Sequence, residues 1–296
     1  MATLAMFTAI CFWASALIVN KILLQTLAIS EIAVVRFLVG AVLLWLVVLV
    51  AGHFRAVRAA GPRPLLMGLL DPGSVSLFII WGQFYTSAVN AAVLWSLMPV
   101  ISPIAARLIL KERLRPVYAV AGPLAVGGTL VLVWGQASIG QGSPFGDSLC
   151  AIGVGCAIAN SMVARRVAQA QPNPLVTTAL QITAAMAMGA FVLTFIEQPD
   201  IRLLDQGADV NLLMLYVGLA GSAGPFLLYN FALRHLPLGR TALFAPLVGP
   251  LGAGLAYFVL GEALSWRGLV AIVVILVAAL LPTITEHGQP KTENSA

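Results

Sequence analysis

Charged residues are scarce in this sequence, at 9% of 296 residues, whereas soluble domains carry about 25%. So few charges cannot cover the surface of a water-soluble globule of this size. A hydrophobic share of 60% excludes a disordered chain, because disorder requires low hydrophobicity. The three cysteines are too few for a disulfide scaffold, and the 27 glycines lack the triplet period of a collagen-like fibre. These absences leave an integral membrane protein.

The hydrophobic residues form long uninterrupted runs, for example residues 32–50 and 269–281. Strands of a membrane barrel would instead alternate apolar and polar residues. Because helices and closed barrels are the structures that satisfy backbone hydrogen bonds in lipid, the runs predict an all-α fold. No basic region precedes the first run, which favours a membrane span over a cleavable signal peptide. Cys11, Cys150 and Cys156 lie in or beside apolar runs and predict no disulfide.

Polar and turn-forming residues divide the chain into ten apolar segments. Each is close to the roughly 20 residues that a helix needs to cross a bilayer. The predicted spans are residues 3–24, 31–50, 64–85, 89–110, 116–134, 147–164, 174–196, 211–233, 239–260 and 267–281. The residues after Pro282 are polar, and we expect residues 285–296 to form a disordered cytoplasmic tail.

The basic residues test this division of the chain. If the N-terminus is cytoplasmic, twelve Lys and Arg residues fall on the cytoplasmic side and two, Arg202 and Arg267, on the other. The twelve are Arg55, Arg58, Arg63, Arg107, Lys111, Arg113, Arg115, Arg165, Arg166, Arg234, Arg240 and Lys291. Such an excess on one side is an orientation signal, so the net charge of +5 does not indicate a nucleic-acid partner. Both termini are predicted to be cytoplasmic.

A short pattern occurs twice in the chain. A Pro-x-x-x-Pro run at residues 99–103 is followed by an apolar run and Glu112, and a run at residues 246–250 is followed in the same way by Glu262. The pattern predicts two five-helix repeats, residues 1–140 and residues 141–284. Because five is odd, the repeats must cross the membrane in opposite directions. Inverted repeats are typical of secondary transporters that work by alternating access.

Several motifs together resemble a known family. They are Glu31-Ile-Ala-Val-Val-Arg36-Phe37, Tyr85-Thr-Ser-Ala, and Pro99 followed by Lys111-Glu112-Arg113-Leu114. Over about residues 3–282 the chain resembles EamA-type members of the drug/metabolite transporter superfamily, among them bacterial exporters of aromatic or neutral amino acids. The resemblance implies export of small metabolites across the bacterial inner membrane. It implies no particular metabolite.

One face of the third predicted span carries polar and aromatic side chains. Asp71, Ser74, Phe78, Trp81 and Tyr85 follow steps of three and four residues and so share a helix face. This stripe predicts the wall of a solute cavity, with aromatic contacts for an apolar or cationic group. The alternative is ordinary packing, with Trp81 and Tyr85 in the aromatic belt at the membrane surface.

Two charged residues inside spans are candidates for coupling or for substrate contact. Asp71 is the only acid well inside a span, and a charge there is costly enough to suggest a proton carrier or a substrate-amine partner. Alternatively, Asp71 caps a helix that restarts at Pro72, near the cytoplasmic face. Arg36 either holds a substrate carboxylate or extends toward the lipid headgroups. We expect the two charges to lie toward opposite ends of their spans.

Further polar and aromatic residues occur within spans of both halves. Each serves either as a contact between helices or as part of a solute path. The remaining substrate-binding candidates are Trp13, Asn20, Trp95, Asn160, Gln181, Tyr229, Asn230 and Phe244. The candidate hinges are Pro99, Pro103, Pro246 and Pro250, whose alternative is a static kink. We expect Glu112 to be structural, paired with Arg113 or Arg115 or capping the next helix.

The sequence does not favour an enzyme. It contains no cluster of metal-ligating residues at the usual spacing, no phosphate-binding loop and no paired carboxylates within a span, so no metal or cofactor is expected. The preferred interpretation is an exporter of amino acids or similar small metabolites. The alternatives are efflux of cationic drugs or nucleoside-type metabolites, and a membrane scaffold that transports nothing.

Overall fold

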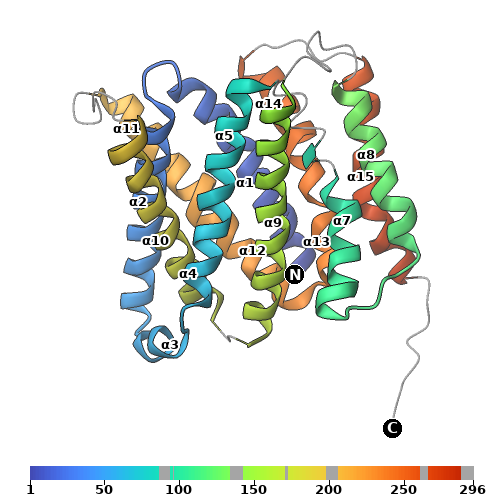
Figure 1. Ribbon diagram of the computed structural model, residues 1–296, viewed down its shortest axis with the longest axis horizontal. Coiled ribbons are helices and arrows are strands. Elements are labelled where there is room, and N and C mark those ends of the chain that lie inside the picture. The colour runs from blue at the N-terminus through green and yellow to red at the C-terminus, as the bar shows by residue number, and fades with distance from the viewer. Residues whose placement is uncertain are drawn as a thin grey trace.

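The computed structural model describes residues 1–86, 94–95, 97–133, 143–170, 173–197, 206–260 and 266–287. These residues form helices that stand side by side in one bundle (Figure 1). In the first half they are α1 Ala2–Leu23, α2 Ile29–Val50, α3 Phe54–Ala59, α4 Arg63–Gly68, η1 Leu69–Ser74, α5 Val75–Tyr85, α7 Met98–Ala105, η2 Ala106–Leu110 and α8 Val117–Val133. In the second half they are α9 Pro144–Ala170, α10 Pro174–Val192, η3 Leu193–Glu197, α11 Ala208–Tyr216, η4 Val217–Ala223, α12 Gly224–His235, α13 Leu238–Ala242, η5 Ala245–Leu247, α14 Val248–Leu260 and α15 Trp266–His287.

The helices confirm the all-α fold with ten spans and correct several of its boundaries. The sixth span begins at Pro144 and continues to Ala170, well beyond the predicted residues 147–164. The last span continues to His287 instead of ending at residue 281. Among the described residues, five continuous helical runs are long and apolar enough to cross a membrane. Short α3, which was not predicted, lies in the basic connection after α2.

The third span of each half is interrupted. In the first half, η1 separates α4 from α5, and Asp71 inside it has non-helical backbone angles (φ −146°, ψ 119°). Pro72 follows directly and cannot donate a backbone hydrogen bond, which accounts for the break. In the second half, η4 occupies the corresponding place between α11 and α12. η1 is thus a kink where two helices meet at Asp71, whereas the wide helical turns of η4 are of a kind frequently found at functional sites.

Helix pairing reflects the duplication. The first span of each half packs against the third span of the other half, as α1 against α12 and α9 against α5. The second spans, α2 and α10, pack against each other, and so do the fifth spans, α8 and α15. In Figure 1, α1 begins near the lower end of the bundle whereas α9 begins at its upper end. The two halves are therefore inverted with respect to each other.

Two close backbone contacts repeat between the halves. A Cβ added at Gly68 would lie 1.9 Å from the backbone oxygen of Gln181, and one added at Gly218 would lie 3.3 Å from the backbone oxygen of Arg36. In each case a glycine at the start of an interrupted span meets the second span of the other half. The corresponding contacts hold the two interrupted helices against the centre of the bundle.

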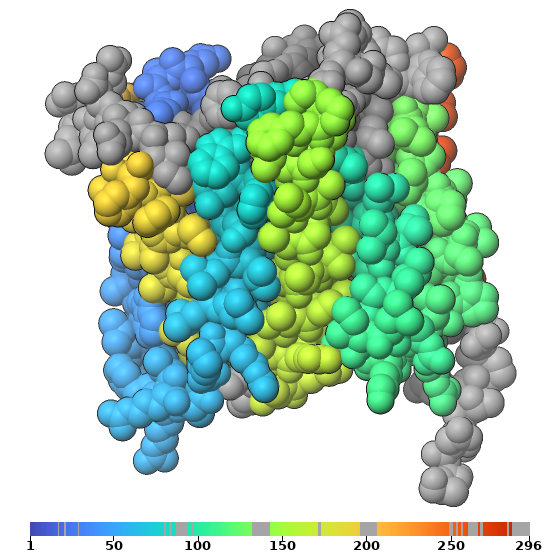
Figure 2. Space-filling model, in the orientation of Figure 1, coloured from blue at the N-terminus to red at the C-terminus, as the bar shows by residue number. Residues whose placement is uncertain are grey.

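The lower end of the bundle in Figure 1 is called the basic face from here on. It carries α3, the connection 111–116 and the C-terminal ends of α9, α12 and α15. The flanks of the bundle are continuous, as Figure 2 shows for the side formed by α5, α9 and α8. Large apolar side chains are exposed there, among them Ile152 of α9 at 48% and Leu108 of η2 at 74%. Such a surface fits contact with lipid tails.

Candidate functional site

The interrupted helix η1 presents Asp71 to the second half of the chain. Asn160 of α9 donates from Nδ2 to Oδ2 of Asp71 at 3.3 Å. Gln181 of α10 donates from Nε2 to the backbone oxygen of Asp71 at 2.9 Å. The non-helical backbone of Asp71 explains why a side chain from another helix can reach this carbonyl. Asp71 therefore connects η1 to two helices of the other half.

A second step of this network leads from α10 to α12. Asn230 donates from Nδ2 to Oε1 of Gln181 and to Oγ1 of Thr178, both at 2.9 Å. Gln181 is 0% exposed and Asn230 is 2% exposed. A buried amide that bridges two helices in this way is held firmly in place. The network therefore fixes the amide groups around Asp71 in one arrangement.

The side chain of Arg36 points into the bundle. A Cβ added at Gly221 would lie 3.2 Å from Cδ of Arg36, and the guanidinium carbon lies 4.5 Å from the ring centre of Phe37. Arg36 and Asp71 lie close enough to interact electrostatically. The expectation that these charges lie toward opposite ends of their spans is therefore wrong. The alternative in which Arg36 extends to the headgroups is also wrong, because Nε of Arg36 is buried.

Several buried polar atoms inside the bundle have no hydrogen-bond partner within the part of the chain that the structure describes. They are Asn20 Oδ1, Arg36 Nε, Asn160 Oδ1, Ser222 Oγ and Asn230 Oδ1. An unsatisfied buried polar atom costs about 1–3 kcal/mol. The group contains several acceptors and one cationic donor. It is suited to a polar solute or to water.

Aromatic side chains stand beside the polar network. Trp13 of α1 meets Phe226 edge to face with ring centres 5.3 Å apart, and it meets Tyr229 at 5.9 Å. Tyr229 in turn lies within electrostatic reach of Asp71. This contact brings the first span of one half beside the third span of the other. The predicted candidates Trp13, Tyr229 and Asn230 therefore lie together with Asp71.

The predicted stripe on the third span is only partly brought together. Trp81 lines a small cavity of about 30 Å³ between α2, α5 and α10, on a helix face that also carries Gly73 and Leu77. Phe78 instead packs against Gly153 of α9, and Tyr85 is 56% exposed and packs against Phe145. The backbone break separates Asp71 from the regular helix α5, and within α5 Phe78, Trp81 and Tyr85 reach different neighbours. Ser74 directly precedes α5.

Two other candidates lie in apolar clusters. Phe244 is 2% exposed and packs with Met6 and Ile275, and Trp95 packs beside Val75 and Met98. Both residues are therefore surrounded by apolar side chains. Their place as substrate contacts remains a prediction.

The candidate hinge prolines occupy different positions in their helices. Pro99 is the second residue of α7, where a missing backbone donor costs little, and Pro103 lies inside α7. Pro246 lies in η5, which separates α13 from α14. Pro250 lies in α14, and its side chain is outside the described residues. A hinge role remains a prediction for these prolines.

Two sets of contacts, those of Thr178 and those of Glu112, were not predicted from the sequence. Thr178 lies three residues before Gln181, so the shared helix face was a signal for its role as a second acceptor of Asn230. Glu112 pairs with Arg165 of α9 at 2.7 Å, a partner that was not predicted. It also accepts a hydrogen bond from the first residue of α13, far along the chain. No local sequence pattern predicts this contact, because Glu112 and its partners are far apart in the chain.

The ten spans and the polar centre between inverted halves define a multi-pass membrane transporter. A model of the EamA-like transporter family matches residues 1–134 and again residues 145–284, and the chain therefore belongs to this family, within the drug/metabolite transporter superfamily. Membership implies secondary transport across a membrane and no enzymatic activity.

A solved crystal structure supports the same fold. It is 19% identical to this chain and superposes with a TM-score of 0.83, over 97% of this chain and 98% of the other. At this identity the likeness concerns the fold alone. A search of curated proteins found no match.

Proposed function

We propose that this protein exports amino acids, or similar small zwitterionic metabolites, from the bacterial cytoplasm across the inner membrane. Alternating access of the site between the two halves carries out the movement. Both termini and the basic face lie in the cytoplasm. This orientation follows the excess of Lys and Arg on that side.

The observation that carries the proposal is the presence of two opposite charges inside the bundle, within electrostatic reach of each other. Arg36 and Asp71 interact electrostatically, and Nε of Arg36 has no hydrogen-bond partner among the described residues. A free α-amino acid carries a carboxylate that fits Arg36 and an ammonium group that fits Asp71. Amide oxygens of Asn160 and Asn230, which also lack partners there, are acceptors for further ammonium hydrogens.

The charged pair also explains how the site tolerates the membrane. An isolated charge at the centre of a bilayer costs at least about 2.5–3.5 kcal/mol, and a neighbour of opposite sign reduces that cost. When a zwitterion binds, its carboxylate takes the place of Asp71 beside Arg36, and its ammonium group takes the place of Arg36 beside Asp71. Each charge therefore keeps a neighbour of opposite sign. The aromatic group of Trp13 and Tyr229 favours substrates with apolar or aromatic side chains.

Counterflow in proteoliposomes tests the proposal. Vesicles loaded with an unlabelled amino acid should take up the labelled compound, and a panel of neutral and aromatic amino acids should identify the preferred one. Arg36→Gln should lower this exchange by at least about tenfold, because a carboxylate then loses its charged partner. Asn211→Ala is the matched control, because Asn211 is exposed and donates to the nearby backbone of Gln206. Exchange unaffected by Arg36→Gln would contradict the proposal.

Efflux of cationic aromatic compounds is the second candidate. Trp13 and Tyr229 lie beside Asp71, and aromatic faces together with one carboxylate bind cations. The two candidates differ in their response to Arg36→Gln. A cationic substrate should be carried as well or better by this variant, whereas Asp71→Asn should abolish its transport. A nucleoside included in the panel tests the third solute class, and a scaffold would exchange none of them.

Labelling of whole cells tests the orientation. A single cysteine placed by Arg113→Cys should react with an impermeant reagent only after the cells are opened. One placed by Trp266→Cys should react from outside, because the connections after the fourth and ninth spans lie on opposite sides of inverted halves. Reaction of both positions from the same side would overturn the inverted arrangement.

A further inference from the structure

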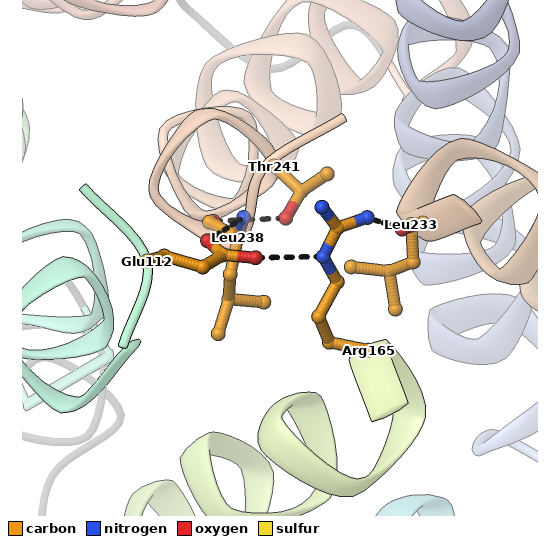
Figure 3. Close-up of polar contacts among 5 residues, drawn as sticks. All are labelled: Glu112, Arg165, Leu233, Leu238 and Thr241. Atoms are coloured by element: carbon orange, nitrogen blue, oxygen red, sulfur yellow. Dashed lines mark hydrogen bonds and ion pairs between the residues drawn. The ribbon is translucent and has the colours of Figure 1, made fainter. Parts of the chain in front are cut away.

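The basic face carries an ion pair that joins the two halves. Glu112, in the connection after η2, accepts from Nε of Arg165 in α9 at 2.7 Å. The other oxygen of Glu112 accepts from the backbone N–H of Leu238, the first residue of α13, at 3.1 Å. Arg165 also donates from Nη1 to the backbone oxygen of Leu233, near the end of α12. We call this set of contacts the tie (Figure 3).

All partners of Glu112 in the tie come from the other half of the chain. One carboxylate of the first half therefore holds α9, the end of α12 and the start of α13 together. Thr241 supports the arrangement by donating from Oγ1 to the backbone oxygen of Leu238 at 2.9 Å. The side chains of Arg165 and Glu112 are only 12% and 19% exposed, so water screens their attraction less than it would at an open surface.

An apolar layer packs around the tie. It is made by buried residues of five elements from both halves. They are Met67, Ala106, Met162, Ala164, Val167, Ala168, Leu233 and Leu238. Leu233 and Leu238 belong to both the layer and the tie, and Tyr229 packs against the layer from the side of Asp71. Along α9, Met162 lies inward of Arg165, whereas Val167 and Ala168 lie nearer the basic face, so the layer surrounds the tie. Tyr229 and the polar site lie further inward.

The small cavity lined by Trp81 lies on the other side of the site. Ser30, which also lines it, is near the start of α2, at the end of the bundle away from the basic face. The tie and the apolar layer together join the two halves at the basic face. Opening between the two halves at this face requires α9, α12 and α13 to separate from the Glu112 connection.

We propose that Glu112 and Arg165 form the latch of the basic face, and that this ion pair breaks whenever the site opens to that side. The proposal rests on the proposed function for the direction of transport, and on the contacts of Glu112 for the closure itself. Neither residue touches the solute. Both act by setting the fraction of molecules that are closed.

A buried thiol reports on the latch. Met162→Cys places one in the apolar layer, where the native side chain is 5% exposed. The three native cysteines are replaced by alanine so that this thiol is the only one. The full chain is placed in lipid nanodiscs, where both faces meet the solvent, and alkylation by a water-soluble maleimide is timed. This measurement requires neither a substrate nor a known orientation.

Glu112→Gln and Arg165→Gln should each speed alkylation at least about tenfold, because each removes the charge from one side of a partly buried pair. Arg166→Gln is the matched control. Arg166 is the next residue of α9, is exposed, and donates to the backbone oxygen of Ile109 without contacting Glu112. Its alkylation rate should equal that of the parent.

Unchanged alkylation in both variants, while they elute as folded protein, would overturn the latch. An equal increase in Arg166→Gln would overturn it as well. If the glutamine variants do not fold, Arg165→Lys takes their place: it keeps the charge but cannot reach both Glu112 and the Leu233 carbonyl, and it should still exceed Arg166→Lys. Faster alkylation without amino-acid counterflow would support the latch and reject the proposed substrate.

Discussion

The contact between Gly68 and α10 gives the sharpest test of how the bundle is held together. Gly68 is the last residue of α4, and a Cβ added there would lie 1.9 Å from the backbone oxygen of Gln181 and 2.8 Å from Cβ of Ala184. A carbon atom normally stays about 3.3 Å or more from such an oxygen. Gly68→Ala therefore requires α4 and α10 to separate by roughly 1.4 Å along this direction.

The magnitude of the effect follows from two terms. Overpacking of a tight contact costs about 1–3 kcal/mol. The same separation stretches the 2.9 Å hydrogen bond from Gln181 to Asp71 beyond hydrogen-bonding distance, which adds about 1 kcal/mol. We expect the apparent melting temperature to fall by about 4–16 °C, since the two terms sum to about 2–4 kcal/mol and each kcal/mol lowers it by roughly 2–4 °C. Transport should fall with it, because Gln181 no longer holds Asp71.

Thermal unfolding of the purified protein in one detergent, followed by tryptophan fluorescence, measures this change. Gly127→Ala is the matched control, because Gly127 lies inside α8 and an added Cβ would meet nothing within 4 Å. A helix-interior glycine replaced by alanine without a clash stabilises by roughly 0.5–1 kcal/mol, so this variant should melt slightly higher. A Gly68→Ala protein that melts as high as Gly127→Ala would refute the close contact.

Three further changes probe the network around Gly68. Asn230→Leu leaves the Gln181 side-chain oxygen without its donor and should destabilise by about 1–3 kcal/mol, read as a lower melting temperature. Thr183→Val removes the acceptor of the Trp45 indole N–H, 2.9 Å away in α2, and should cost about 1 kcal/mol by the same measurement while leaving the exchanged solute unchanged. Asp71→Asn should abolish any dependence of transport on pH if this carboxyl carries the coupling proton; a normal rate with normal pH dependence would exclude that role.

The spans and the duplication could be predicted because they depend on signals that extend over many residues. Continuous apolar runs identify helices in lipid, and the distribution of Arg and Lys fixes their alternation. The sixth span was predicted too short because Arg165 and Arg166 were taken as its end. In the structure the helix carries both residues on to the basic face and ends at Ala170. Charges near a helix end therefore marked the membrane surface and not the end of the helix.

The site was predictable as a set of residue types but not as a geometry. Amides inside apolar helices indicated Asn160, Gln181 and Asn230, because such groups must find partners in lipid. The direction of Arg36 could not be read, since a long side chain near a helix end reaches either headgroups or a neighbouring helix. The small residues that admit it, such as Gly221 in η4, lie in the other half of the chain. The same limit hid the partner of Glu112, because that pairing depends on how the halves meet.

The two halves share a scaffold but divide the chemistry of the site between them. The charges, Arg36 and Asp71, both come from the first half. The amides that hold Asp71, those of Asn160 and Gln181, come from the second half, and so does Asn230, which holds Gln181. At the place of Arg36 the repeat has Gln181, which keeps the polar contact without the charge. A movement of one half against the other would leave the charged pair together while stretching its bonds to the amides. Charges confined to one half would therefore allow the site to change its amide contacts between the two open states while the solute stays bound to the same pair.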